Sequence, residues 1–201
     1  MNKPNSKIID SDLSWKSHIT TIEKKLACAV GILGKIRYKL NRKTSLLLYD
    51  TLVHSHLVYC NIVWATTYKT SLITIASLQK RALKICCRTD KQVGCSIYKQ
   101  SNRVSIFDLN KMCIAKFVFS SLLNTLPSCF NNYFINVSAV HQHCTRQTSQ
   151  LFLSYARTNI RRFSISIAGP IVWNSIPNTL KLLHSMYSFC KLYKTFLLDN
   201  S

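Results

Sequence analysis

Residues 45–64 form a strongly apolar segment, in which thirteen of the twenty residues are apolar and Asp50 alone carries a formal charge. The apolar residues follow the 3.6-residue period of an α-helix and also cover much of the remaining circumference. A helix that is apolar nearly all round belongs in a protein interior. The pattern therefore predicts a buried central helix around which the other segments pack.

Amphipathic patterns predict further helices on both sides of this segment. One stripe begins at Ile19 and keeps helical spacing to Leu40, with Asn41 as a plausible end. Thr44 or Ser45 can cap the central helix, and the two helices should then form an antiparallel hairpin. A third helix is expected over residues 71–88, because apolar residues recur there on one side.

Two more helices are expected in the second half of the chain. Ser105 followed by Asp108 resembles a capping box, and helical spacing continues from there to Leu126. A last helix begins near Ser185 and docks by an apolar stripe. Residues 89–104, between the third and fourth helices, are polar and indicate a loop.

Alternating apolar and polar residues occur in two short runs, 151–155 and 163–167. Such runs on either side of a polar segment predict a β-hairpin with a basic turn. Gly169 and Pro170 should end the second strand, and Pro170 can begin a short helix. The basic residues of the predicted turn are Arg157, Arg161 and Arg162.

Together these elements define a mainly α fold, built as a helical bundle around the central apolar helix, with a small β-hairpin and a C-terminal helix. We expect four parts along the chain. They are the remnant of a strand from a preceding domain (1–12), a helical bundle (13–127), a polar loop (128–150), and a subdomain of the β-hairpin and C-terminal helix (151–201).

The charge balance is strongly basic and favours a polyanionic partner. Lysine and arginine number 27 and aspartate and glutamate number 7, which gives a formal net charge of +20. A field of this sign attracts nucleic acid, whether RNA, DNA or an RNA–DNA heteroduplex. A charged face that only meets solvent is the alternative for the basic side of the third helix. The candidate nucleic-acid-binding residues are Lys80, Arg81, Lys84 and Arg88 on one side of the third helix, with Arg157, Arg161 and Arg162 at the hairpin turn.

The sequence indicates neither a membrane segment nor a secretory route. No run approaches about 18 uncharged apolar residues, and the first residues lack the apolar core of a signal peptide. We therefore expect an intracellular protein, in the nucleus or the cytoplasm, whose nine cysteines are mostly reduced core residues. No small-molecule substrate is evident.

Little in the sequence suits catalysis or metal binding. Asp10 and Asp12 are the only close pair of carboxylates, and helix capping is favoured over a metal-dependent polymerase or nuclease role. No phosphate-binding loop, nucleophile elbow or zinc-protease motif occurs, and no cofactor is expected. Zinc binding is disfavoured because the possible ligands have a spacing that matches no familiar finger. These candidate ligands are Cys129, His141, His143 and Cys144.

Several short motifs follow one another in a fixed order along nearly the whole chain. They include Leu13-Ser14-Trp15 with His18-Ile19, Tyr59-Cys60 with Trp64, Gln79-Lys80-Arg81-Ala82, Leu126-Pro127, and Gly169-Pro170 with Trp173-Asn174. Together they resemble the region that follows the catalytic palm in reverse transcriptases of non-LTR retrotransposons, the LINE or jockey type of transposable element. Cys60 departs from that pattern, in which glycine is commonest, and no [FY]-A-D-D motif occurs.

The resemblance implies that residues 13–127 form a thumb-like region that grips the template–primer duplex without catalysing polymerisation. Lys80 and Arg81 lie within a matching motif, whereas Lys84 and Arg88 are assigned from helical spacing alone. The chain by itself is therefore not expected to be an enzyme. Three alternatives stay open: a stand-alone RNA- or DNA-binding helical protein, a protein-interaction module with a basic surface, and a transposon relic with no selected function.

Overall fold

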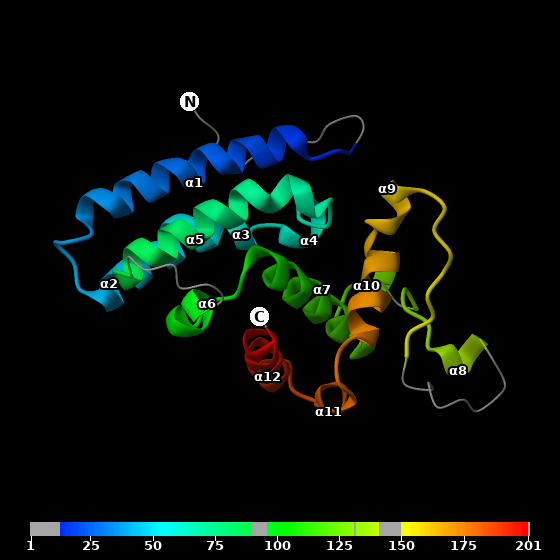
Figure 1. The fold of residues 1–201 in the computed structure, drawn as a ribbon. Coiled ribbons are helices and arrows are strands. Elements are labelled where there is room, and N and C mark those ends of the chain that lie inside the picture. Colours follow the sequence, from blue (N-terminus) through cyan, green and yellow to red (C-terminus); the bar gives the residue numbers. More distant parts are fainter. Residues whose placement is uncertain (1–12, 90–95, 131, 141–149, 201) are drawn as a thin grey trace. The chain divides into compact units, whose positions relative to one another are not determined.

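The computed structural model describes residues 13–89, 96–130, 132–140 and 150–200 (Figure 1). These ranges hold helices and loops and no β-sheet, which confirms the predicted mainly α fold. The chain divides into two compact units, residues 1–109 with 198–201 (unit 1) and residues 110–197 (unit 2). The division falls inside a helix, ahead of the boundary at residue 127 that we expected.

Unit 1 is built on α1 and α5, which pack along each other (Figure 1). Leu26 and Leu33 of α1 and Ile75 and Leu83 of α5 belong to its buried core. The elements of unit 1 are α1 (Lys16–Ile36), α2 (Arg42–Tyr49), the π-helical turn η1 (Asp50–His54), α3 (Ser55–Val58), α4 (Asn61–Trp64), the 3-10 turn η2 (Lys69–Leu72), α5 (Ile73–Cys87), α6 (Ser96–Ser101) and the first residues of α7 (Ile106–Leu122).

The apolar segment 45–64 is buried as predicted, but it is not one continuous helix. Tyr49, Val53, Leu57 and Trp64 are fully buried. The π-helical turn η1 interrupts the regular hydrogen-bond pattern. The chain then breaks at Cys60, whose φ of 49° and ψ of 30° are left-handed. The prediction that this segment is buried is therefore confirmed, and the prediction that it forms one continuous helix is wrong.

Two side chains pair the backbone groups that this break releases. The Asn61 amide donates a hydrogen bond to the Leu57 carbonyl at 2.8 Å, and the Trp64 indole donates to the Tyr59 carbonyl at 2.9 Å. A buried carbonyl without a partner would cost free energy comparable to a lost hydrogen bond. The break is therefore compatible with a buried position.

Asn41 begins a helix instead of ending one. Its Oδ1 accepts a hydrogen bond from the Thr44 N–H at 2.8 Å, which makes Asn41 the N-cap of α2. The prediction that Thr44 or Ser45 caps this helix is therefore wrong, and the cap is Asn41. α1 ends earlier, at Ile36.

The predicted capping pair of Ser105 and Asp108 at the start of α7 is confirmed, with Ser105 as the N-cap. Ser105 Oγ accepts a hydrogen bond from the Asp108 N–H at 3.2 Å and donates one to Asp108 Oδ2 at 2.7 Å. α7 ends at Leu122 rather than Leu126, because Asn124 takes a left-handed φ of 54° that an α-helix cannot continue. The short helix α6 occupies part of the segment that we expected to be a loop.

A buried amide joins three segments of unit 1. Gln79, on α5, is fully buried. Its Nε2 donates to the Tyr49 hydroxyl at 3.0 Å and to the Val104 carbonyl at 2.9 Å, and its Oε1 accepts from the Ile106 N–H at 2.9 Å. These bonds offset the cost of burying the amide, and they fix the rotation of α5 about its own axis.

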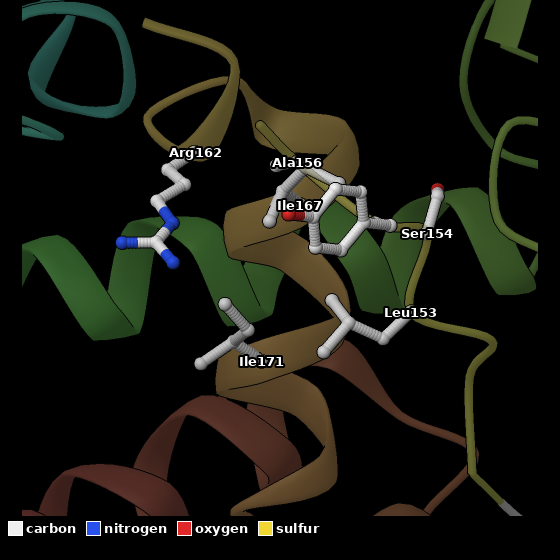
Figure 2. A pocket seen from close by; sticks show the side chains of 7 residues that line it. Leu153, Ser154, Ala156, Arg162, Ile167 and Ile171 are labelled. Carbon is white, nitrogen blue, oxygen red and sulfur yellow. The ribbon is translucent and has the colours of Figure 1, made fainter. Parts of the chain in front are cut away.

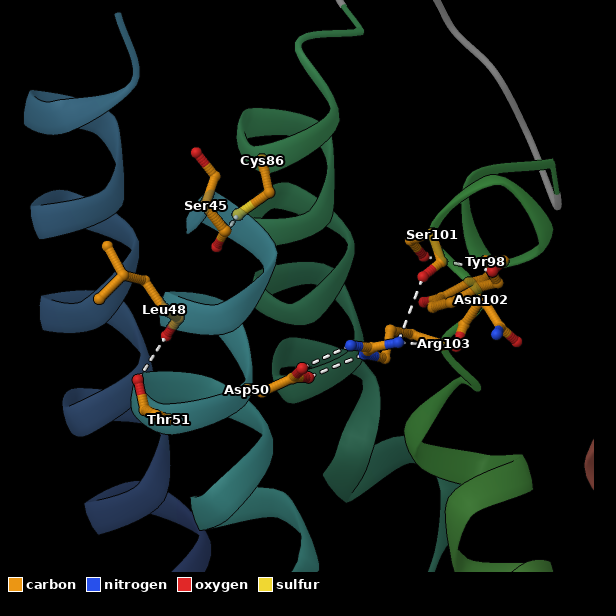
Figure 3. A network of polar contacts seen from close by, with 9 residues as sticks. All are labelled: Ser45, Leu48, Asp50, Thr51, Cys86, Tyr98, Ser101, Asn102 and Arg103. Atoms are coloured by element: carbon orange, nitrogen blue, oxygen red, sulfur yellow. Dashed lines mark hydrogen bonds and ion pairs between the residues drawn. The ribbon is translucent and has the colours of Figure 1, made fainter. Parts of the chain in front are cut away.

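Asp50, the one charge in the apolar segment, is paired with an arginine (Figure 3). Its Oδ1 accepts from Arg103 Nε at 2.7 Å, and Arg103 Nη2 bonds to Oδ2, so the pair is bidentate. The hydrogen bond to Asp50 raises the pKa of Arg103 and keeps it charged.

Nearby, the Cys86 thiol donates to the Ser45 carbonyl at 3.3 Å, and burial raises the pKa of Cys86 to about 12.

Unit 2 has an aromatic core. Phe119 on α7 stacks on Phe189 with ring centroids 4.5 Å apart, and Trp173 lies 6.2 Å from Phe119 and 5.9 Å from Phe189. Gly169 allows close packing, because an added Cβ would lie 2.6 Å from the Phe134 ring. The elements of unit 2 are the rest of α7, the 3-10 turn η3 (Ser128–Phe130), α8 (Val137–Val140), α9 (Asn159–Arg162), α10 (Ile165–Asn174), α11 (Asn178–Lys181) and α12 (Met186–Asp199) up to residue 197.

The predicted β-hairpin is wrong. Residues 165–167 begin α10, and the extended segment at Leu151 has a single bridge, to Asn136. The Asn174 side chain takes the place of a second strand, since its Oδ1 accepts from the Leu151 N–H at 2.9 Å and its Nδ2 donates to the Leu151 carbonyl at 3.0 Å. Three alternating residues are too few to distinguish a strand from a half-buried helix.

Three other expectations concern the short helix at Pro170 and the two ends of the chain. The C-terminal helix is confirmed as α12. Pro170 lies inside α10 and does not begin a helix. The strand expected in residues 1–12 lies outside the described residues.

Replacing Gln79 with alanine should destabilise unit 1 by about 3 kcal/mol, because three buried groups would lose a hydrogen-bond partner. Urea denaturation followed by circular dichroism measures the change. Ser77→Ala, on the exposed face of the same helix, is the matched control and should change stability by at most about 0.5 kcal/mol. Equal effects of the two substitutions would contradict this role of Gln79.

Cys60→Gly should stabilise unit 1 by about 1 kcal/mol, because a left-handed backbone is unfavourable for a residue with a Cβ and free of that cost for glycine. Cys28→Gly provides the opposite case, since Cys28 is an exposed residue inside α1. It should cost about 0.3 kcal/mol, the difference between the helix propensities of cysteine and glycine. Thermal unfolding measures both, and a less stable Cys60→Gly protein would contradict the argument.

Candidate nucleic-acid interface

The basic face expected on the third helix is present on α5. Arg81 is exposed and Lys80 and Lys84 are half-buried, whereas Gln79 and Leu83 on the other side are fully buried. Within the described part of the chain, these three basic side chains make no hydrogen bond or ion pair. Three unpaired charges therefore lie along one outer side of a helix whose inner side is fixed in the core.

Arg88 has a different role from these three residues. It is the C-cap of α5, with a left-handed φ of 55°. Its Nη2 donates to the Arg37 carbonyl at 3.4 Å and also to the Leu40 carbonyl. Both carbonyls follow the end of α1, so Arg88 attaches this turn to the end of α5 while its side chain stays exposed.

A shallow pocket of about 280 Å³ adjoins the basic face. Lys80 is the one charged residue in its lining, and Tyr98 and Phe107 contribute aromatic rings. Ile73, more than half exposed, forms another part of the wall. Apolar and aromatic surface therefore lies beside Lys80 on the outer side of α5.

The second basic cluster lies on α9 and just before it. Arg157, Arg161 and Arg162, here called the arginine cluster, are all exposed. Thr158 caps the helix through its Oγ1, which accepts from the Arg161 N–H at 3.4 Å. The arginine cluster therefore occupies a loop and one helical turn rather than the turn of a hairpin.

Unit 2 contains no acidic residue. Its sequence, residues 110–197, has nine lysines and arginines and neither aspartate nor glutamate, which gives a formal charge of +9 with histidine neutral. Charges of one sign raise the local potential and favour an external anion. Unit 2 therefore contains no acidic side chain that could form an ion pair with the arginine cluster.

Sequence reasoning missed the polar side chains that shape these surfaces. Gln79 carried a usable signal, because it is a polar residue on the apolar side of an amphipathic helix. No local pattern pointed to the pairing of Arg103 with Asp50, which lie 53 residues apart. Asn174 likewise binds Leu151 across 23 residues.

The described residues contain no group of three histidine, cysteine or acidic side chains placed to hold a metal ion. Cys129 is exposed on η3. The other three candidates for zinc, His141, His143 and Cys144, lie outside the described residues, as do Asp10 and Asp12. In the part of the chain that the structure covers, no helix is both long and apolar enough to cross a membrane.

Comparison with known proteins identifies no family for this chain. Neither a protein-family profile nor a solved structure matches it. A curated protein of Plasmodium falciparum, the Protein SEY1 homolog, is 27% identical over 137 residues. That match covers 68% of this chain and 14% of the Plasmodium protein, so the chain corresponds to a small part of that protein's length.

Arg88→Gln should lower the stability of unit 1 by about 1 kcal/mol, because it removes the hydrogen bonds to the carbonyls that follow α1. Lys84→Gln removes the same charge from a side chain without such bonds and should stay within about 0.5 kcal/mol of the parent protein. Urea denaturation compares the two variants. An equal loss of stability in both would mean that charge, and not these hydrogen bonds, accounts for the effect.

Proposed function

We propose that this chain is the noncatalytic, nucleic-acid-binding tail of a non-LTR retrotransposon reverse transcriptase, an RNA-directed DNA polymerase. In this proposal α5 grips the backbone of the template–primer duplex. The observation that carries it is the row of unpaired cations on the outer side of α5, formed by Lys80, Arg81 and Lys84.

A protein that tracks a duplex needs charge on a rigid element rather than groups that read bases. Contacts to phosphates position a protein without reading sequence, and an A-form duplex hides its major groove from side chains. α5 meets this requirement, because the buried bonds of Gln79 fix its orientation and no acidic residue occurs within it. Its cations therefore present a constant surface to a passing backbone.

Two features of unit 1 support the family resemblance on which this proposal draws. Cys60 has a left-handed backbone at the position where the resembled motif usually has glycine. Gln79, beside Lys80 and Arg81 in the Gln-Lys-Arg-Ala motif, is the centre of a buried network. Both positions thus have a physical reason for the residue type that the motif contains.

Duplex binding should weaken with salt in proportion to the number of phosphates contacted. If Lys80, Arg81 and Lys84 each neutralise one phosphate, replacing all three with glutamine should reduce the log–log salt slope by roughly 2.7, since each contact contributes about 0.9. Fluorescence anisotropy of a labelled RNA–DNA heteroduplex, measured at several salt concentrations, gives the slope.

The matched control removes three charges from another surface. Lys24, Lys35 and Lys39 are exposed on α1 or just after it, and their replacement by glutamine lowers the net charge equally. A similar fall in slope for both triple variants would attribute binding to net charge and refute a site on α5. Primer extension by the purified chain would refute the noncatalytic assignment.

A further inference from the structure

A pocket of about 460 Å³ opens on unit 2 beside the arginine cluster (Figure 2). Leu153 and Ile171 lie near each other at one end of it, and the Arg162 side chain extends on the side away from Ser154 (Figure 2). Leu153 is 49% exposed and Ile171 is 52% exposed. The pocket therefore combines an uncovered apolar wall with a cationic edge.

Tyr155 adds an aromatic ring to the same lining. It is 84% exposed, and it lies two residues before Arg157 in the chain. A ring left this exposed keeps apolar surface in water, which a stacked partner would cover. Exposed aromatic rings beside arginines are the combination by which proteins hold unpaired bases, with the rings stacking on bases and the guanidinium groups meeting phosphates.

The arginine cluster has no counter-charge within its own unit. Residues 110–197 contain no carboxylate side chain, and the three guanidinium groups make no ion pair with any other described residue. An anion that binds the arginine cluster therefore has to come from outside unit 2. A nucleic-acid strand supplies them at regular intervals together with flat apolar bases, which matches both the charge and the wall of the pocket.

We propose that this pocket is a binding site for an unpaired RNA or DNA strand. One base enters against Leu153 and Ile171, a neighbouring base stacks on Tyr155, and the arginine cluster contacts the phosphates. A base inside a duplex has both faces covered by its neighbours, so only an unpaired strand offers a base to an apolar wall. The inference rests on the proposed nucleic-acid function and adds a second site with a different strand preference.

Binding of a labelled single-stranded oligouridylate to the full chain tests this site by fluorescence anisotropy. Tyr155→Ala should weaken binding roughly 5- to 150-fold, the range for losing one stacked base, and should leave binding of a heteroduplex unchanged. Tyr187→Ala is the matched control, because Tyr187 is 76% exposed in the same unit and does not line the pocket. It should leave the affinity for the single strand unchanged.

Replacing the arginine cluster with glutamine should lower the salt slope of single-strand binding by roughly 2.1, since each contact to a single strand contributes about 0.7. The variant with Lys24, Lys35 and Lys39 replaced by glutamine loses the same charge and should keep the parent slope. Photocrosslinking of a strand that contains 5-iodouridine, followed by mass spectrometry, should place the crosslink on Tyr155.

Three results would overturn the inference. Equal affinities of Tyr155→Ala and Tyr187→Ala for oligouridylate would exclude stacking on Tyr155. Equal losses in the two triple variants would reduce the interaction to net charge. Displacement of the strand by polyglutamate at matched charge would assign the pocket to an acidic protein instead.

This inference and the proposed function fail in different ways. If the α5 variant keeps its heteroduplex slope while Tyr155→Ala loses the single strand, the duplex grip is refuted and the pocket stands. If Tyr155→Ala binds oligouridylate normally while the α5 variant loses its slope, the pocket is refuted and the duplex grip stands.

Discussion

The orientation of α5 depends on one buried side chain, Gln79. Its amide pairs with the Tyr49 hydroxyl and with backbone groups of Val104 and Ile106, and a buried amide is tolerated only when it is paired in this way. A shift of α5 by one residue would turn it by about 100°, which would break these bonds and move its cations toward the core. The packing of unit 1 and the outward direction of Lys80, Arg81 and Lys84 therefore have the same origin.

The two units use charge differently. In unit 1, the carboxylate of Asp50 pairs with Arg103, and that of Asp108 accepts a hydrogen bond from Ser105, which caps α7. Both carboxylates thus serve the fold, and the cations Lys80, Arg81 and Lys84 of α5 have no ion pair within the described residues. Unit 2 has no carboxylate side chain to neutralise the arginine cluster. In unit 1 the acids are engaged in the fold, and in unit 2 there are none. In both units, basic side chains are therefore available to an external anion, which is the electrostatic basis of the nucleic-acid proposals.

Elements with long periodic patterns were predictable from the sequence. α5 begins and ends within a few residues of the predicted bounds, and α12 begins one residue after the predicted start. The predictions that are wrong, the β-hairpin and the continuous central helix, concern segments in which a side chain forms the hydrogen bonds that another stretch of backbone would otherwise form. Asn174 stands in for a strand beside Leu151, and Asn61 binds the Leu57 carbonyl where the central segment breaks. The basic face of α5 followed from charge and helical spacing, whereas the role of Arg88 depends on carbonyls that only folding brings near it.

The lack of carboxylates in unit 2 has a consequence for its response to salt. Its nine lysines and arginines repel one another and meet no acidic side chain within residues 110–197. Dissolved ions screen exposed charges over about 10 Å, whereas the stacked rings of Phe119 and Phe189 carry no charge to screen. Added salt would therefore reduce the repulsion within unit 2 while it weakens the attraction of the arginine cluster for an anion.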